Sequence, residues 1–252
     1  MEEWILRNGA WLRAVPFFGL LAGLALLEHA RPWRTVRRNR GPRWRANLAL
    51  LVAGALAARL VVPAGAVGAA LWAEDRGVGL LTASGLPVWL RWTAGIIALD
   101  LALWLQHLAL HRVPLLWSLH RVHHTDVDLD ATSAGRFHPL EIVGSLAWKA
   151  AVAVAVGVPA AAVLVYEAVL AAFAVLTHAN LGSERGAWIT WFLVTPAVHR
   201  IHHSIHPDES SANFGTVTTT WDRAFGTLRL EPREDSRTMT LGVAPATDPD
   251  AP

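Results

Sequence analysis

The chain has 252 residues, of which 53% are apolar or aromatic and 17% are charged. This composition is too apolar for an ordinary soluble domain and predicts a membrane protein. The net charge of only +2 argues against a nucleic-acid-binding surface, and the absence of cysteine excludes disulfides and thiolate metal sites, so any metal must be bound by imidazole and oxygen.

Two apolar stretches open the chain. The first runs from about Trp11 to Leu27 and the second from about Leu48 to Trp72, with seven arginines between residues 31 and 45. The acidic start of the chain, without a small-residue cleavage site, favours an uncleaved anchor over a signal peptide. Arginines beside membrane spans favour the cytoplasmic side, so we expect this loop in the cytoplasm and the loop from Glu74 to Pro87 outside.

A third span, from about Val88 to Leu110, leads back to the cytoplasmic side. Residues 142–176 are apolar again, interrupted by Gly157 and Pro159. One straight helix of that length would be about 50 Å long, against about 30 Å for a bilayer core, so a helical hairpin is expected. The sequence thus predicts an all-α integral membrane protein with about four transmembrane helices plus a helical hairpin break, and a cytoplasmic histidine-rich helical cap.

The chain becomes polar after the last apolar stretch. Residues 213–228 lack helical periodicity, and we expect them to form an ordered but irregular cytoplasmic segment. Residues 229–252 are rich in proline, aspartate, glutamate and threonine with few large apolar side chains. This composition predicts a mostly disordered tail.

Three short histidine runs lie at the predicted inner ends of these spans: His107-Leu-Ala-Leu-His111, His120-Arg-Val-His123-His124 and His199-Arg-Ile-His202-His203. Residues three and four apart share a helix face, so each run presents two or three imidazoles in one direction. The span boundaries place all three runs, and His178, at one membrane face. Eight or nine ligands exceed what one ion takes, so two metal ions are the simplest interpretation, and scattered structural histidines are the alternative. Ligand type and number alone do not choose iron over zinc.

Asp100 lies inside the third span, on the same face as His107. A carboxylate in a membrane span is costly and usually has a partner. It could accept a hydrogen bond from a ligand imidazole and fix its tautomer, or form a salt bridge to Arg91 or Arg59.

Other polar residues near the runs are candidates for supporting roles. His138 could orient a ligand or contact substrate, or hold a structural hydrogen bond, and for His206 a surface or supporting role is favoured over ligation. Asn180 is a candidate polar contact in the cytoplasmic cap. For the alternating Asp126, Asp128 and Asp130 a solvated loop is favoured, and a supporting role for one of them beside a ligand histidine is the alternative.

The order of the histidine runs resembles that of the fatty acid hydroxylase / sterol desaturase superfamily of integral membrane di-iron enzymes. The likeness covers about residues 95–228. Further stretches are similar to the family pattern: Arg136-Phe-His-Pro-Leu-Glu141, His178-Ala-Asn180, Thr195-Pro196, Asn213-Phe-Gly215 and Trp221-Asp-Arg-Ala-Phe-Gly-Thr227.

The resemblance implies a di-iron centre, with zinc as a possible substitute in a purified sample, and no catalytic residue beyond the metal ligands. The implied reaction inserts oxygen into a C–H bond of a lipid, or forms a double bond, with consumption of O₂ and two electrons. Three parts are expected: transmembrane anchor helices in residues 1–90, a catalytic domain in 91–228 and the tail in 229–252. The implied iron ligands are His107, His111, His120, His123, His124, His199, His202 and His203, with His178 as a ninth.

The partners follow from what the sequence lacks. No nucleotide-binding glycine motif and no haem or flavin domain is present, so we expect a separate electron donor of the ferredoxin or cytochrome type. The expected location is a bacterial cytoplasmic membrane. Two other hypotheses remain, a histidine-rich metal transport or storage protein and a zinc-dependent lipid hydrolase. The lipid itself is open among sterols, carotenoids, fatty acyl chains and ether lipids.

Overall fold

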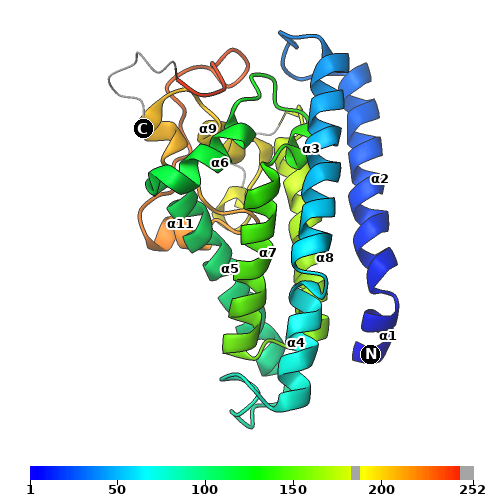
Figure 1. Cartoon of the computed structure of the whole chain (residues 1–252). Coiled ribbons are helices and arrows are strands. Elements are labelled where there is room, and N and C mark those ends of the chain that lie inside the picture. Colours follow the sequence, from blue (N-terminus) through cyan, green and yellow to red (C-terminus); the bar gives the residue numbers. More distant parts are fainter. Residues whose placement is uncertain (183–187, 245–252) are drawn as a thin grey trace.

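The computed structural model describes residues 1–182 and 188–244, and the regular elements of these residues are helices (Figure 1). Five helical stretches are long and apolar enough to cross a membrane, which confirms the predicted all-α membrane fold. They are α2 (Gly9–Ala30), α3 (Arg40–Val61) continued by α4 (Gly65–Arg76), α5 (Val88–Arg112), α7 (Pro139–Val156) and α8 (Ala160–His178). The short helices are α1 (Glu2–Arg7), α6 (Pro114–His124), η1 (Ala131–Gly135), η2 (Trp188–Trp191), α9 (Pro196–His202), α10 (Pro207–Ser210) and α11 (Thr220–Ala224).

The predicted hairpin break lies between α7 and α8. Gly157 ends α7 in the left-handed conformation, with φ +74°, and its N–H donates to the carbonyls of Ala153 and Val154. A Cβ on Gly157 would lie 2.6 Å from Thr82 Oγ1, so only glycine fits this turn. Pro159 caps α8. The sequence therefore encodes the reversal at the position where the apolar run is interrupted.

The two arms of the hairpin share α4 and α5 as neighbours and differ in the outer helix that each contacts. α7 packs against α3, α4 and α5, whereas α8 packs against α2, α4 and α5. The main apolar core is formed where α4, α5 and α8 meet, around Ala70, Leu99 and Val163. On the outside, α2 and α3 expose large apolar side chains such as Leu26 and Leu60, as helices facing lipid do. The bundle therefore has a thin apolar core and a lipid-facing surface.

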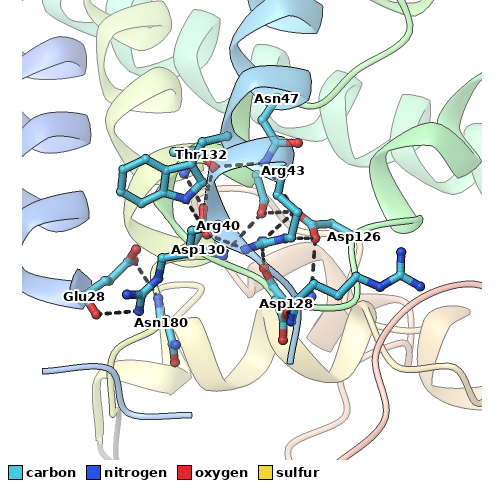
Figure 2. Close-up of polar contacts among 12 residues, drawn as sticks. Glu28, Arg40, Arg43, Asn47, Asp126, Asp128, Asp130, Thr132 and Asn180 are labelled. Carbon is cyan, nitrogen blue, oxygen red and sulfur yellow. Dashed lines mark hydrogen bonds and ion pairs between the residues drawn. The ribbon is translucent and has the colours of Figure 1, made fainter. Parts of the chain in front are cut away.

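A buried network of arginine and aspartate joins α3 to the segment after α6 (Figure 2). Arg43 donates to both oxygens of Asp126, at 2.7 and 2.9 Å, and to Asp130 Oδ2 at 3.0 Å. Asp128 accepts from the backbone N–H groups of residues 37 and 38. The prediction of a solvated loop for these three aspartates is wrong, because Arg43 of α3 pairs with Asp126 and Asp130, and backbone N–H groups of the preceding loop bind the Asp128 carboxylate. As whole residues, Asp126, Asp128 and Asp130 are 4, 9 and 5% exposed.

The end of the described chain also differs from the expected disordered tail. Met239 and Leu241 are buried against Leu129, and Gly242 N–H donates to the His203 carbonyl at 3.1 Å. The guanidinium of Arg34 donates to the carbonyls of Ser236 and Met239. Buried apolar side chains and hydrogen-bonded backbone carbonyls thus hold residues 231–242 on the cap, by which we mean α6, α9 and the segments that follow each of them. Residues 245–252 lie outside the described part.

Candidate metal centre

The nine histidines singled out from the sequence gather at one end of the bundle. They come from the ends of α5 and α8, from α6, and from α9 with the residue that follows it. They form two groups, and within each group one ring nitrogen of every histidine lies within 4.8 Å of those of the other members. The first group is His107, His111, His120, His124 and His202, and the second is His123, His178, His199 and His203.

The HxxHH spacing divides each of its two runs between the groups. On α6, His120 and His124 are four residues apart and share the face toward the first group, whereas His123 points to the second. On α9 the assignment is reversed, since His199 and His203 join the second group and His202 joins the first. Pro114 and Pro196 start these helices, and Thr195 Oγ1 caps α9 by accepting from the Val198 N–H.

Hydrogen bonds on Nδ1 fix the tautomers of five rings. A carbonyl only accepts, so a ring nitrogen beside one must carry the proton. The Nδ1 atoms of His107, His178 and His202 donate in this way to the carbonyls of Phe214, Ala174 and Ala212, at 2.8, 2.7 and 2.8 Å. His123 donates to the Arg136 carbonyl at 3.3 Å, and His120 donates to the Glu141 carboxylate at 2.7 Å. Each neutral ring then has an unprotonated Nε2.

These unprotonated nitrogens face one another across each group. The Nε2 atoms of His123 and His178 are 3.0 Å apart, and those of His107 and His120 are 3.2 Å apart. Two facing lone pairs repel, and a cation between them removes the repulsion. Nitrogens bound at about 2.0–2.1 Å to one metal, at roughly right angles, lie about 3 Å apart. The donor set and its spacing therefore fit a metal in each group.

Burial keeps the imidazoles outside the membrane-spanning helices neutral. It lowers the pKa of His202 to about 3 and, with the neighbouring histidines, holds the pKa values of His123, His124, His199 and His203 well below 6.5. The ring nitrogens of His124 have no hydrogen-bond partner among the described residues. Buried, neutral imidazoles with unused lone pairs are what a metal site requires.

Two carboxylates that sequence reasoning did not single out support the rings. Glu141, in the first turn of α7, accepts from His120 and is 5% exposed. Asp222 accepts from the N–H groups of Phe214 and Gly215, at 2.9 and 2.7 Å, and so positions the carbonyl that binds His107. Both residues lie within the stretches that resemble the family pattern, and this resemblance could have marked them as candidates.

Asp100 is engaged by neither of its two expected partners. It accepts from Tyr166 Oη, Thr218 Oγ1 and Trp221 Nε1, at 2.9, 2.7 and 2.9 Å. Asp100 of α5 therefore connects three parts of the fold, because Tyr166 lies on α8, Thr218 lies in the segment before α11 and Trp221 lies on α11. Among the described residues, neither the expected hydrogen bond to an imidazole nor the expected salt bridge to Arg91 or Arg59 is formed.

The remaining candidates make structural contacts in the described part of the chain. His138 caps α7 by accepting from the Leu140 N–H, and His206 Nε2 lies 2.8 Å from Glu234 Oε1. The Asn180 side chain accepts from the Arg34 N–H and donates to the Arg34 carbonyl. The backbone N–H of Asn180 donates to Glu28 (Figure 2).

An apolar cavity of about 410 Å³ begins at the histidines and runs into the membrane-spanning bundle. Members of both groups line it, with His107 and His120 from the first and His123, His178 and His199 from the second. Further along, α5, α7 and α8 contribute its walls, including Leu103, Leu146 and Leu170. The site is therefore open toward the apolar interior of the bundle.

Comparison with known proteins gives relatives with named activities. The chain is 29% identical over 150 residues to the ornithine lipid hydroxylase OlsE of Rhizobium tropici, a match that covers 60% of the chain and 45% of that protein. It is 27% identical to the alkylglycerol monooxygenase of Xenopus tropicalis over 137 residues and 28% identical to that of Homo sapiens over 140, covering 54 and 56% of the chain and 30 and 31% of those proteins. The matches thus span less than half the length of these relatives. No solved structure matches the chain. The sequence model of the fatty acid hydroxylase family matches residues 92–227, more than half of the chain, and the chain belongs to this family.

Proposed function

We propose that this protein is a membrane-bound di-iron oxygenase that hydroxylates a C–H position of a lipid, with O₂ and two electrons. The observation that carries the proposal is the pair of buried histidine groups at the mouth of an apolar cavity between membrane-spanning helices. The names of the relatives, a lipid hydroxylase and monooxygenases, favour hydroxylation over desaturation. They also make aminolipids and ether lipids the first substrates to test.

The proposed ligands are the five histidines of the first group for one iron and the four of the second for the other. When bound, the two irons supply the redox chemistry that activates O₂. The protein orients the rings through Nδ1, with Glu141, Asp222 and backbone carbonyls as the fixing groups. Such outer hydrogen bonds set both ring orientation and basicity.

The apolar walls of the cavity position the lipid and keep water from the reacting carbon. Leu110 and Phe137 lie beside the histidines in this lining. On the other side, the cap and residues 231–242 cover the last histidine run, with Gly242 bonded to the His203 carbonyl. Substrate would reach the cavity from the bilayer, and water would be excluded from both directions.

We further propose that the histidine groups face the cytoplasm of a bacterial cell and that a ferredoxin or cytochrome supplies the electrons. The arginine-rich loop between α2 and α3 lies at the same end of the bundle as the cap (Figure 1). Exposed arginines of this region include Arg31 and Arg38 in the loop and Arg45 at the start of α3. This distribution agrees with the orientation that positive residues favour.

The test combines metal analysis with oxygen labelling. Protein purified without oxygen should contain about two irons per chain, and cells that contain the protein should incorporate ¹⁸O from ¹⁸O₂ into one lipid class. A matched strain with His124→Ala and His203→Ala should show neither the iron nor the label. Zinc at full occupancy with product formed under anoxia would contradict the proposal in favour of hydrolysis. Uptake of metal into proteoliposomes would contradict it in favour of transport.

A further inference from the structure

Away from the histidines, the cavity lining includes two members of a partly exposed ion cluster, whose third member, Arg13, has a side chain that is 46% exposed. Lys149 on α7 and Glu167 on α8 both line the cavity, and their side chains are 14 and 11% exposed. Lys149 Nζ donates to Glu167 Oε1 at 2.9 Å, and Arg13 Nη1 on α2 donates to Glu167 Oε2 at 3.1 Å. One carboxylate thus serves two cations, and the cluster has an excess of positive charge.

Lys149 has unused hydrogen-bonding capacity at this position. An ammonium group has three N–H donors, and the partner of this one among the described residues is Glu167. The other polar pair of the cavity, Gln106 and Ser145, is joined by its own hydrogen bond of 2.6 Å. Charged groups within membrane spans are costly and usually serve a function. An oxygen atom of a ligand in the cavity is the partner that would complete the ammonium.

The distance from Lys149 to the histidines can be read along the helices. Lys149 is eight residues beyond Glu141, which contacts His120, and this corresponds to about 12 Å of helix. Glu167 is eleven residues before His178, or about 16 Å of helix. A molecule that fills the cavity therefore has one end at the ammonium and the other at the metal groups.

We propose that Lys149, held by Glu167, anchors a hydroxyl or carbonyl oxygen of the lipid substrate, so that the carbon presented to the histidines is remote from that polar group. This inference rests on the proposed function and specifies its substrate: an amphiphile that enters with its polar end toward the outer half of the bundle. The walls between the two ends are mainly apolar and suit a chain or ring, and the polar pair Gln106 and Ser145 in them is joined by its own hydrogen bond.

Photo-crosslinking of the full chain in detergent tests the orientation without requiring turnover. Two long-chain primary alcohols are used, one with a diazirine beside the hydroxyl-bearing carbon and one with the diazirine at the opposite end. The first should label the walls near Lys149, at Leu146 or Leu170, and the second should label the histidine end, at Phe137. The reverse pattern would overturn the proposal.

Substitution of the anchor adds a quantitative test. Lys149→Met leaves Glu167 paired with Arg13, and loss of one charge-assisted hydrogen bond should lower labelling by both probes about tenfold or more. Lys149→Arg should retain most of the labelling. The control Arg45→Met also removes one cation, but at an exposed position of α3 outside the cavity lining, and should change the labelling less than about twofold. Undiminished labelling of a folded Lys149→Met protein would refute the anchor. Should that variant not fold, the wild-type labelling pattern decides.

The outcome is separable from that of the proposed function. If the labelling has the expected polarity but no ¹⁸O enters a lipid, the oxygenase proposal fails and the orientation stands. If ¹⁸O enters a lipid and the labelling polarity is reversed, only the role of Lys149 fails.

Discussion

Replacement of Arg43 by methionine should destabilise the cap more than any other change at the arginine-rich end of the bundle. Arg43 is paired with Asp126 and Asp130, and the three side chains are 9, 3 and 7% exposed. Arg43→Met leaves two buried carboxylates without their cation. Removing one partner of a buried ion pair costs about 3–5 kcal/mol, because the remaining charge stays buried and unpaired.

This cost corresponds to a measurable shift in thermal unfolding. For a chain of this size each kcal/mol changes the midpoint by about 2–4 °C, so a decrease on the order of 10 °C is expected. Unfolding in detergent can be followed by tryptophan fluorescence. Arg45→Met is the matched control, because Arg45 is exposed on the same helix and should change the midpoint by about 1–2 °C at most. Equal midpoints for the two variants would show that the buried network does not stabilise the protein as argued.

Three further predictions concern the site and its scaffold. Glu141→Gln should weaken metal binding about 10- to 100-fold, measured by competition with a chelator, because the carboxylate that accepts from His120 Nδ1 and orients its ring is lost; unchanged affinity would exclude this role. Gly157→Ala should destabilise the hairpin by about 1–3 kcal/mol or more in denaturant titrations, because φ is +74° there and a Cβ has no space. Burial raises the pKa of Asp126, but the hydrogen bonds and charge of Arg43 outweigh this and hold it below 3.8. The stabilising contribution of ionised Asp126 is therefore present above about pH 4 and is lost as the pH falls through its depressed pKa. Thermal unfolding midpoints that stay constant down to about pH 2 would contradict the stabilising role of the Asp126–Arg43 pair.

The spans and the hairpin were predictable because hydropathy and the Gly157–Pro159 interruption are local signals. The convergence of the histidines was predictable as well, since each run follows the inner end of an apolar span. The roles of the acidic residues were not. Asp126 is stabilised by Arg43, 83 positions earlier in the chain, and no local pattern distinguishes such a pair from a solvated loop.

The division of the histidines between two groups also lay beyond the sequence. Spacing shows that His120 and His124 share a face, but it does not give the rotation of α6 about its axis. That rotation is set by tertiary contacts such as the one between Glu141 and His120. Composition did not predict the packing of residues 231–242 either. The segment is hydrophilic on average, but its few apolar side chains, Met239 and Leu241, are buried against Leu129.

The crossed assignment on α6 and α9 has a consequence for metal loading. Each of these short helices contributes rings to both groups, so an ion bound in one group would also restrict the rings of the other group around the alignment that the tertiary contacts give them. A second ion would then bind to rings that already move less, and the entropy of ordering them would be lost only once. A population with half its metal should consist largely of chains with both ions and chains with none.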